Sequence, residues 1–483
     1  MSQIIPLTLF LYRGGARKFT RKLVRYLSIF VISLAAAAVG YGQVSAPVGG
    51  SNSGKDSPGP AVEFRVAGAS SAPENWIAAY VDPIQGLSSI DLARRALTSN
   101  TQIAATRLEI DRARARVRQA ELRPNPSVNF EQQNGVFNSP GERGTTIGFS
   151  MPLELWGQRG RRIDLARAEL EASEADVADR ERRLSSDVRL AYVETLAALR
   201  ELEVTQNLYS LDVEMARVVE ARVEEGDAAP LELNLLRAEV DRLRARRALV
   251  EGRVQASATR LKQLVGMAPG EQLQLREVLM APLLPEPPTS LDAAIEIALR
   301  ARPDLRFARL SEVVAMAGYR LAQAQAAPQV TAFAQYSDVL GTFDDTPIGA
   351  LNDRDKLLAF GVTITLPIFN RNQGAKADAQ LAIAQARARR EFTESVVRAE
   401  VTAAYHRYEA AQASIRTYER GVIERSEQNV RTMRAAYQVG AFRVSELLAE
   451  QRRLVDMQRE MTEALAERYR ALAELRAALG ITD

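Results

Sequence analysis

The sequence predicts a mainly α-helical protein with a small β part, built as an internal duplication. Three observations support this fold class. Two long stretches, 160–225 and 374–438, contain no proline and carry apolar residues at helical, coiled-coil spacing. Four short stretches alternate apolar and polar residues, as β-strands do. Similar landmarks also occur twice in the same order, which indicates that one structural unit has been repeated.

Residues 1–42 have the pattern of a secretory signal peptide. A basic segment without acidic residues precedes the apolar run 26–39, and the small residues Gly40 and Gly42 suit a cleavage site. An uncleaved N-terminal anchor is the alternative. Removing the six basic residues from the formal net charge of +3 leaves −3, so the charge gives no support to a nucleic-acid partner. These residues are Arg13, Arg17, Lys18, Arg21, Lys22 and Arg25.

Residues 43–87 are rich in Gly, Ser, Pro and Ala and have no lasting period. Such a composition cannot bury enough apolar surface to offset the entropy of ordering, so we expect a flexible leader here.

The first repeat is expected over residues 88–270. A helix begins near residue 89 and continues to about 122, where Pro124 and Pro126 stop it. Strands are expected at about 126–134 and 145–154. The long helix 160–225, a break at Gly226 and a return helix over 231–265 complete the repeat. A proline-rich linker, 271–289, follows.

The second repeat, 290–483, has the same plan. Its strands are expected at about 328–336 and 357–367, and its long helix spans 374–438. Gly440 corresponds to Gly226, and Gly480 corresponds to Gly266, both at an offset of 214 residues.

The four predicted strands have the length and alternation of tilted strands in a membrane barrel. Four strands cannot close a barrel, and open strand edges do not exist in lipid, so several copies of the chain would have to pool their strands. The periodicity alone also allows a small soluble β-subdomain between coiled-coil arms.

Over residues 88–481 or so, the chain resembles the TolC-like outer-membrane efflux proteins. The resemblance is carried by the duplicated plan and by two strand-to-helix turns, 152–157 and 367–372. The tip turns match as well: Gly226 with Leu231 and Leu233, and Tyr437-x-x-Gly440 followed by 446–448. The form Pro-Leu-Glu-Leu at 152–155, followed by Gln-Arg-Gly-Arg-Arg at 158–162, is similar to the cobalt/zinc/cadmium-type branch of heavy-metal efflux.

This resemblance implies a homotrimer in which twelve strands form an outer-membrane barrel in contact with lipid and the long helices form a periplasmic α-barrel. The implied function is a passive exit duct for metal ions or drugs. Its partners would be a periplasmic adaptor (membrane fusion) protein and an inner-membrane pump of the RND type. The alternatives are the duct of a type I protein secretion system and a periplasmic coiled-coil scaffold or adaptor.

The helical tips are the candidate functional sites. The resemblance places them at the periplasmic end, in contact with the adaptor, and the residues expected there are Gly226, Pro230, Leu231, Gly440, Val444 and Leu447. Glu446 and Glu450 are candidates for a charged gate. The simpler interpretation is that the first set only closes the hairpins and that the two carboxylates lie on a solvated helix face.

No constellation for catalysis, cofactor binding or metal binding is found. The chain has no cysteine, and His406 is its one histidine, so no disulfide, Cys/His metal site or His-based triad can be assembled. The chain is therefore not expected to be an enzyme or to carry a cofactor.

Overall fold

The computed structural model describes residues 79–134, 143–280, 284–343, 351–438 and 441–481. The predicted signal peptide and most of the predicted leader lie outside these ranges, so both stay predictions.

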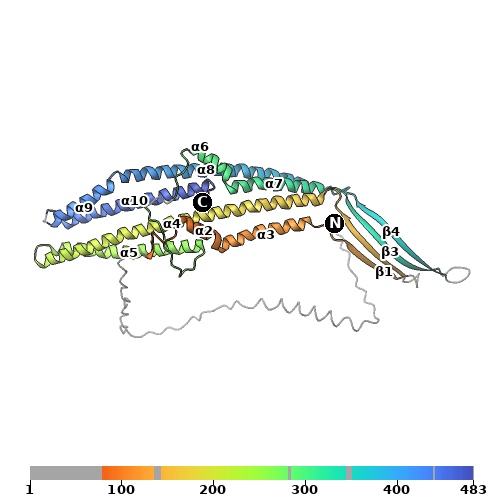
Figure 1. The fold of residues 1–483 in the computed structure, drawn as a ribbon, viewed down its shortest axis with the longest axis horizontal. Helices are drawn as coiled ribbons and strands as arrows, with labels where there is room; N and C mark the ends of the chain where they lie inside the picture. The colour runs from red at the N-terminus through yellow and green to blue at the C-terminus, as the bar shows by residue number, and fades with distance from the viewer. Residues whose placement is uncertain (1–78, 135–142, 281–283, 344–350, 439–440, 482–483) are drawn as a thin grey trace, which may run out of the picture. The chain divides into compact units, whose positions relative to one another are not determined.

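The first half of the described chain contains two short helices, two strands and two long helices (Figure 1). They are α2 (Ser89–Ser99), α3 (Thr101–Glu121), β1 (Ser127–Asn134), β2 (Arg143–Leu153), α4 (Gln158–Glu224) and α5 (Pro230–Val265). The single helix expected over 89–122 is wrong: Asn100 divides it. The Asn100 side chain accepts hydrogen bonds from the N–H groups of Gln102 and Ile103, which makes it the N-cap of a new helix.

The second half repeats this order. It contains α6 (Leu291–Ala301), α7 (Pro303–Ala324), β3 (Gln329–Phe343), β4 (Leu351–Thr365), α8 (Gln373–Glu419), α9 (Val422–Gln438) and α10 (Val444–Ala478). The helix expected over 374–438 is interrupted, because Gly421 adopts a φ of +92° that an α-helix cannot continue through. The predicted duplication is nevertheless present, with α8 and α9 together corresponding to α4.

The two strand-to-helix turns are equivalent in conformation. Gly157 is the N-cap of α4 with a φ of +76°, and Asn372 is the N-cap of α8 with a φ of +56°. Both residues are in the left-handed region, which Gly adopts freely and Asn tolerates better than most residues. The sheet therefore joins the long helix in the same way in both halves.

The four strands form one antiparallel sheet in the order β1-β2-β3-β4. The two halves join within it, since Met151 of β2 pairs with Ala332 of β3. The second pair of strands is longer than the predicted 328–336 and 357–367, because the ladder continues to the pair Phe343 and Leu351. This extension is rich in polar residues, including the ion pair of Arg354 with Asp338, and its apolar residues do not alternate regularly, so the sequence pattern did not reveal it.

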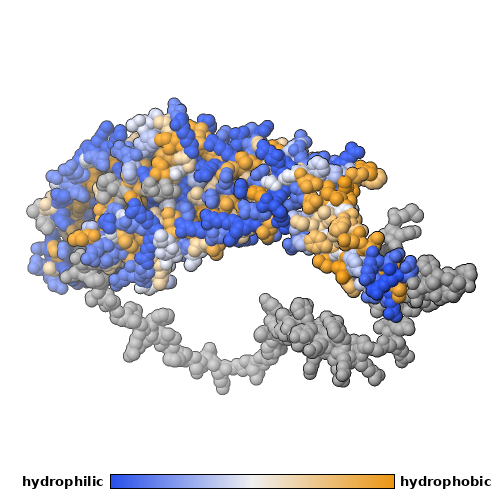
Figure 2. Space-filling model, turned by 45° about the vertical axis from the view of Figure 1, so that its right-hand side comes forward, coloured by the Kyte–Doolittle hydropathy of each residue, from blue (hydrophilic) through white to orange (hydrophobic). Residues whose placement is uncertain are grey.

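Large apolar side chains are exposed on the sheet. Figure 2 shows hydrophobic residues gathered over the strands next to the helices. They include Val128, Phe130, Phe360, Val362 and Ile364. In a solvated sheet these side chains would face water, so their exposure indicates contact with an apolar medium or partner.

The long helices lie side by side (Figure 1). α4 contacts α3 and α5 on one side and α7 and α10 on the other, and α8 contacts both α7 and α10. Their packing is dominated by alanine, valine and leucine, with Val188, Val254, Val401 and Ala473 fully buried. Within the described ranges, no helix combines the length and the apolar character needed to cross a membrane.

The end of each return helix packs against the start of its own half. A Cβ atom on Gly266 would lie 2.6 Å from the carbonyl oxygen of Ser99, and one on Gly480 would lie 3.1 Å from that of Ala301. Both glycines have positive φ values. The two halves thus have the same joint.

Parts of the predicted leader and linker are ordered. Val81 and Leu87, expected in the flexible leader 43–87, form β-bridges with Leu275 of the predicted linker 271–289. The N–H of Leu275 donates a 2.8 Å hydrogen bond to the carbonyl of Tyr80, and the Leu275 side chain is buried in the core. These segments are held by apolar anchors spaced too widely to give a periodic signal.

Candidate functional site

The helical tips are held together by one apolar cluster. The turn between α4 and α5 and the turn between α9 and α10 lie at the same end of the helices (Figure 1). The cluster joins all four helices and consists of Met215, Val219, Leu233, Leu236, Val430, Tyr437, Val444, Leu447 and Leu448. The tips therefore form one packed unit rather than two separate hairpins.

The first turn is closed by backbone hydrogen bonds. Gly226 has a φ of +85°, and the N–H groups of Asp227 and Ala228 both donate to the carbonyl of Arg222. Pro230 starts α5 at a position where no helical N–H is required. Gly226 and Pro230 thus have structural roles in the reversal, and no atom lies within 4 Å of a Cβ placed on Gly226.

The apolar tip residues divide into buried and exposed ones. Val444 and Leu447 are each 1% exposed and belong to the cluster, whereas Leu231 is 68% exposed. Phe442 is also exposed, at 43%. Gly440 lies outside the described residues. Of the predicted contact residues that the structure describes, Leu231 is therefore the large apolar side chain that is exposed to a partner.

A polar contact crosses between the hairpins at the tip. The Tyr437 hydroxyl on α9 donates a hydrogen bond to Glu232 on α5, and the guanidinium of Arg222 lies 5.4 Å from the centre of the Tyr437 ring. Burial and the bond to Glu232 raise the pKa of Tyr437 to about 12. A cavity of about 400 Å³ adjoins these groups. Tyr437 belongs to the tip motif of the sequence, but no sequence signal identifies it as a link between the hairpins.

The two predicted gate carboxylates have local partners. Glu446 accepts a hydrogen bond from the N–H of Arg443 and so caps α10. Glu450 accepts hydrogen bonds from Arg453 and from Asn429 on α9. Both residues thus stabilise the α9–α10 hairpin, and their role in a gate stays a prediction.

A second polar cluster lies farther from the turns. Asp212 on α4 is 1% exposed and is surrounded by Glu239 and Arg242 of α5, Arg434 of α9 and Gln451 of α10. Burial, and then the charge of Glu239, raises the pKa of Asp212 to about 6. Glu239 in turn pairs with Arg452 of α10 at 2.8 Å. Buried charges therefore connect the two hairpins here, and no local sequence signal identifies them.

Among the described residues, no three His, Cys, Asp or Glu side chains come together in a way that could hold a metal ion.

Comparison with known families identifies the chain. The family model described as "Outer membrane efflux protein" matches residues 92–267 and 294–481, one segment in each half. The chain belongs to this family. Membership confirms the resemblance noted from the sequence and the mainly α, duplicated fold with a small β part. The family consists of channel proteins.

Relatives of the chain are named for different substances. The cobalt-zinc-cadmium resistance protein CzcC of Cupriavidus metallidurans is 25% identical over 393 residues, covering 80% of this chain and 88% of that protein. The pyoverdine export outer membrane protein OpmQ of Pseudomonas aeruginosa is 28% identical over 341 residues, or 68% of each chain.

Solved structures of outer-membrane channels share the fold. CusC has a TM-score of 0.69 at 22% identity, covering 82% of this chain and 93% of that chain. VceC of Vibrio cholerae has a TM-score of 0.66 at 20% identity, covering 81% and 96%. As a member of the family, the chain is an efflux duct of the outer membrane that extends into the periplasm, as the sequence predicted.

Proposed function

We propose that three copies of this chain form one duct, in which their sheets join into a barrel of twelve strands. The observation that carries the proposal is the four-stranded sheet itself, because β1 and β4 are its edges in the described chain and apolar side chains are exposed on it. Lipid does not tolerate open edges. Pairing β4 of one copy with β1 of the next closes all of them.

Gel analysis of outer-membrane extracts tests this assembly. Protein extracted in mild detergent should migrate as a trimer and convert to a monomer on boiling. Phe360→Arg should lower trimer recovery, since a lipid-facing Arg costs roughly 2–4 kcal/mol near the bilayer midplane. Lys356→Arg, four residues from Phe360 on the same strand, keeps the charge and is the control. A soluble monomer in the periplasmic fraction would contradict the proposal.

The second part of the proposal is that the tips bind a periplasmic adaptor, which connects the duct to an inner-membrane pump of the RND type. The exposed side chains of Leu231 and Phe442 support an apolar contact at the tips. Two relatives in Pseudomonas putida support a pump partner by their names: the probable efflux pump outer membrane protein SepC and the toluene efflux pump outer membrane protein TtgF.

Two exposed leucines on α5 allow a matched test of adaptor binding. Leu231 lies at the tip, while Leu249 lies on the same helix face about 27 Å away, five turns along. Leu231→Asp should abolish co-purification of the adaptor and export, and Leu249→Asp should leave both unchanged. Equal effects of the two variants would show that the adaptor does not bind specifically at the tip.

For the cargo, we propose metal ions or small organic compounds, since the names of relatives include cobalt, zinc and cadmium resistance as well as toluene and pyoverdine export. The two classes of cargo are separated by growth of a deletion strain and of the same strain with the gene restored, on graded zinc, cobalt, cadmium and toluene. Equal growth of both strains under every condition would contradict both.

A further inference from the structure

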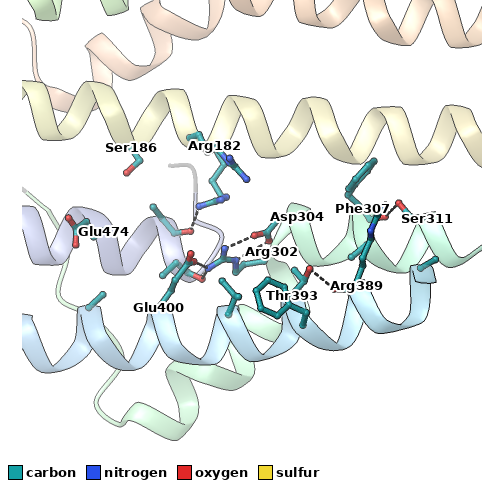
Figure 3. A pocket seen from close by; sticks show the side chains of 18 of the residues that line it. Arg182, Ser186, Arg302, Asp304, Phe307, Ser311, Arg389, Thr393, Glu400 and Glu474 are labelled. Carbon is teal, nitrogen blue, oxygen red and sulfur yellow. Dashed lines mark hydrogen bonds and ion pairs between the residues drawn. The ribbon is translucent and has the colours of Figure 1, made fainter. Parts of the chain in front are cut away.

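A large groove lies between the helices, away from the tips. Its volume is about 1100 Å³, and its lining comes from α4, α7, α8 and α10 (Figure 3). Both α7 and α10 pack between α4 and α8. The groove lies where α10 ends, at Ala478, and α7 begins, at Pro303.

Much of the lining is apolar, with two aromatic rings that reach solvent. Phe392 on α8 is 69% exposed, and Phe307 on α7 is partly exposed. Small side chains around them leave room for a bound molecule: Ala308, Val314, Ala315, Ala382, Ala386, Val396, Ala403 and Ala404.

The charged lining is mostly paired. Arg302 pairs with Asp304 and Glu400, and Arg407 pairs with Glu474, so all three carboxylates of the lining have an arginine partner. The two α4 arginines of the lining, 182 and 183, share Asp179.

Arg389 differs from these arginines. Its side chain is exposed and makes no ion pair with any described residue. Figure 3 shows it extending from α8 toward Phe307 and Ser311 on α7. A guanidinium without a carboxylate partner, beside an apolar surface, is the arrangement that binds the anionic group of a ligand with an apolar body.

We propose that this groove binds an amphiphilic organic anion, with Arg389 holding its carboxylate, sulfonate or phosphate and Phe307 and Phe392 contacting its apolar body. Because the paired carboxylates are already neutralised, the lining keeps a positive charge that favours such an anion over a cation. The further claim that cargo passes through this groove rests on the proposed duct function. The claim that the groove binds an anion does not, because binding needs neither pump nor adaptor.

The test uses two probes of similar shape and different charge. Anilinonaphthalene sulfonate carries a sulfonate, and N-phenyl-1-naphthylamine has the same aromatic body without it. Their fluorescence is titrated with the full-length protein in phosphatidylcholine nanodiscs, with empty nanodiscs subtracted. Arg389→Gln should weaken sulfonate binding roughly tenfold through loss of one charge-assisted contact, and leave binding of the neutral probe unchanged.

Arg398 supplies the control variant. It is exposed and lies nine residues from Arg389, which places it on the opposite face of α8. Arg398→Gln should bind both probes like the wild type. Equal weakening by the two substitutions would overturn the proposal. A wild-type protein that does not bind the sulfonate would overturn it as well.

A second arm identifies the source of the anion. Replacing part of the nanodisc lipid by phosphatidylglycerol should lower sulfonate binding through Arg389 if the natural ligand is a membrane lipid. Unchanged binding assigns the groove to a soluble amphiphile.

Discussion

The hydroxyl group of Tyr437 on α9 donates a 3.0 Å hydrogen bond to Oε2 of Glu232 on α5. The two residues belong to different halves of the duplicated chain, and the bond connects the hairpins where they end. Because Arg222 of α4 lies over the same ring, the Tyr437 side chain links its own helix α9 to both α4 and α5 at the tip. A movement that separates the hairpins must break these contacts.

We expect Tyr437→Phe to loosen the tip. The substitution keeps the ring in the apolar cluster and removes one hydrogen bond, worth about 1 kcal/mol or somewhat more because its acceptor is charged. The single-channel conductance in planar bilayers should rise. Tyr418→Phe is the control, since its hydroxyl bonds to Glu460 within the second half. Equal conductance of Tyr437→Phe and the wild type would mean that this bond does not restrain the pore.

Asp212 predicts a pH dependence of the hairpin contact. Its pKa in the folded chain is about 6, above the ordinary value of 3.8, so the buried carboxylate destabilises the packed state when it is ionised. This cost is present above pH 6 and is relieved as pH falls toward 4. It is on the order of 3 kcal/mol at neutral pH.

The contribution of Asp212 should therefore raise the thermal midpoint of the protein as the pH is lowered from 7.5 to 5. Asp212→Asn, which resembles the protonated form, should be more stable than the wild type at pH 7.5 and lose this part of the pH dependence. Asp241→Asn, an exposed position on α5, should retain it. A wild-type pH profile in Asp212→Asn would show that another group titrates.

Gly266→Ala should destabilise the fold strongly. The added methyl group would meet the Ser99 carbonyl oxygen at 2.6 Å, and the φ of +74° is unfavourable for alanine. A loss of at least about 1–2 kcal/mol is expected. Gly252→Ala, inside α5 with nothing within 4 Å, should instead stabilise the helix by roughly 0.5–1 kcal/mol. The thermal midpoints of the two variants measure the contrast. Similar values would mean that the joint does not require glycine at position 266.

Arg302→Met should also destabilise the fold. Arg302 is almost fully buried and pairs with Asp304 at 2.5 Å and Glu400 at 2.6 Å. Burial acts to raise the pKa of Asp304, but the hydrogen bond and charge of Arg302 outweigh it, so that the pKa lies below its usual value. Removing one partner of such a pair costs roughly 3–5 kcal/mol.

The exposed neighbour Arg300 provides the control for this substitution. Arg300→Met removes only a surface pair with Glu296, so its midpoint should stay close to that of the wild type. If Arg302→Met were equally harmless, the buried pair would be replaceable by apolar packing.

The plan of the fold could be predicted because it rests on local signals. The strands and long helices are defined by periodicity, and the two copies of each landmark support one another. Helix breaks were missed at Asn100 and Gly421, since a single Asn or Gly inside a helical pattern is often tolerated. Whether a helix breaks at such a residue depends on the contacts of that residue in the folded chain, and periodicity carries no information about these contacts.

The links at the tips could not be predicted for a different reason. Tyr437 and Glu232, or Arg452 and Glu239, are more than 200 residues apart, with separations of 205 and 213. Each partner is an ordinary residue for a helix surface. Only the packing of one hairpin on the other brings them together, and nothing in the sequence distinguishes them from many similar residues.

The paired joints at Gly266 and Gly480 have an evolutionary consequence. Each half ends where it began, so a gene encoding a single half would already yield a unit with its own closure. Fusion of two genes for such a unit would give the present duplicated chain. The two copies of the joint differ in detail: the Asn100 side chain donates to the Leu264 carbonyl in one half, and the buried Arg302 side chain donates to the Ala478 carbonyl in the other.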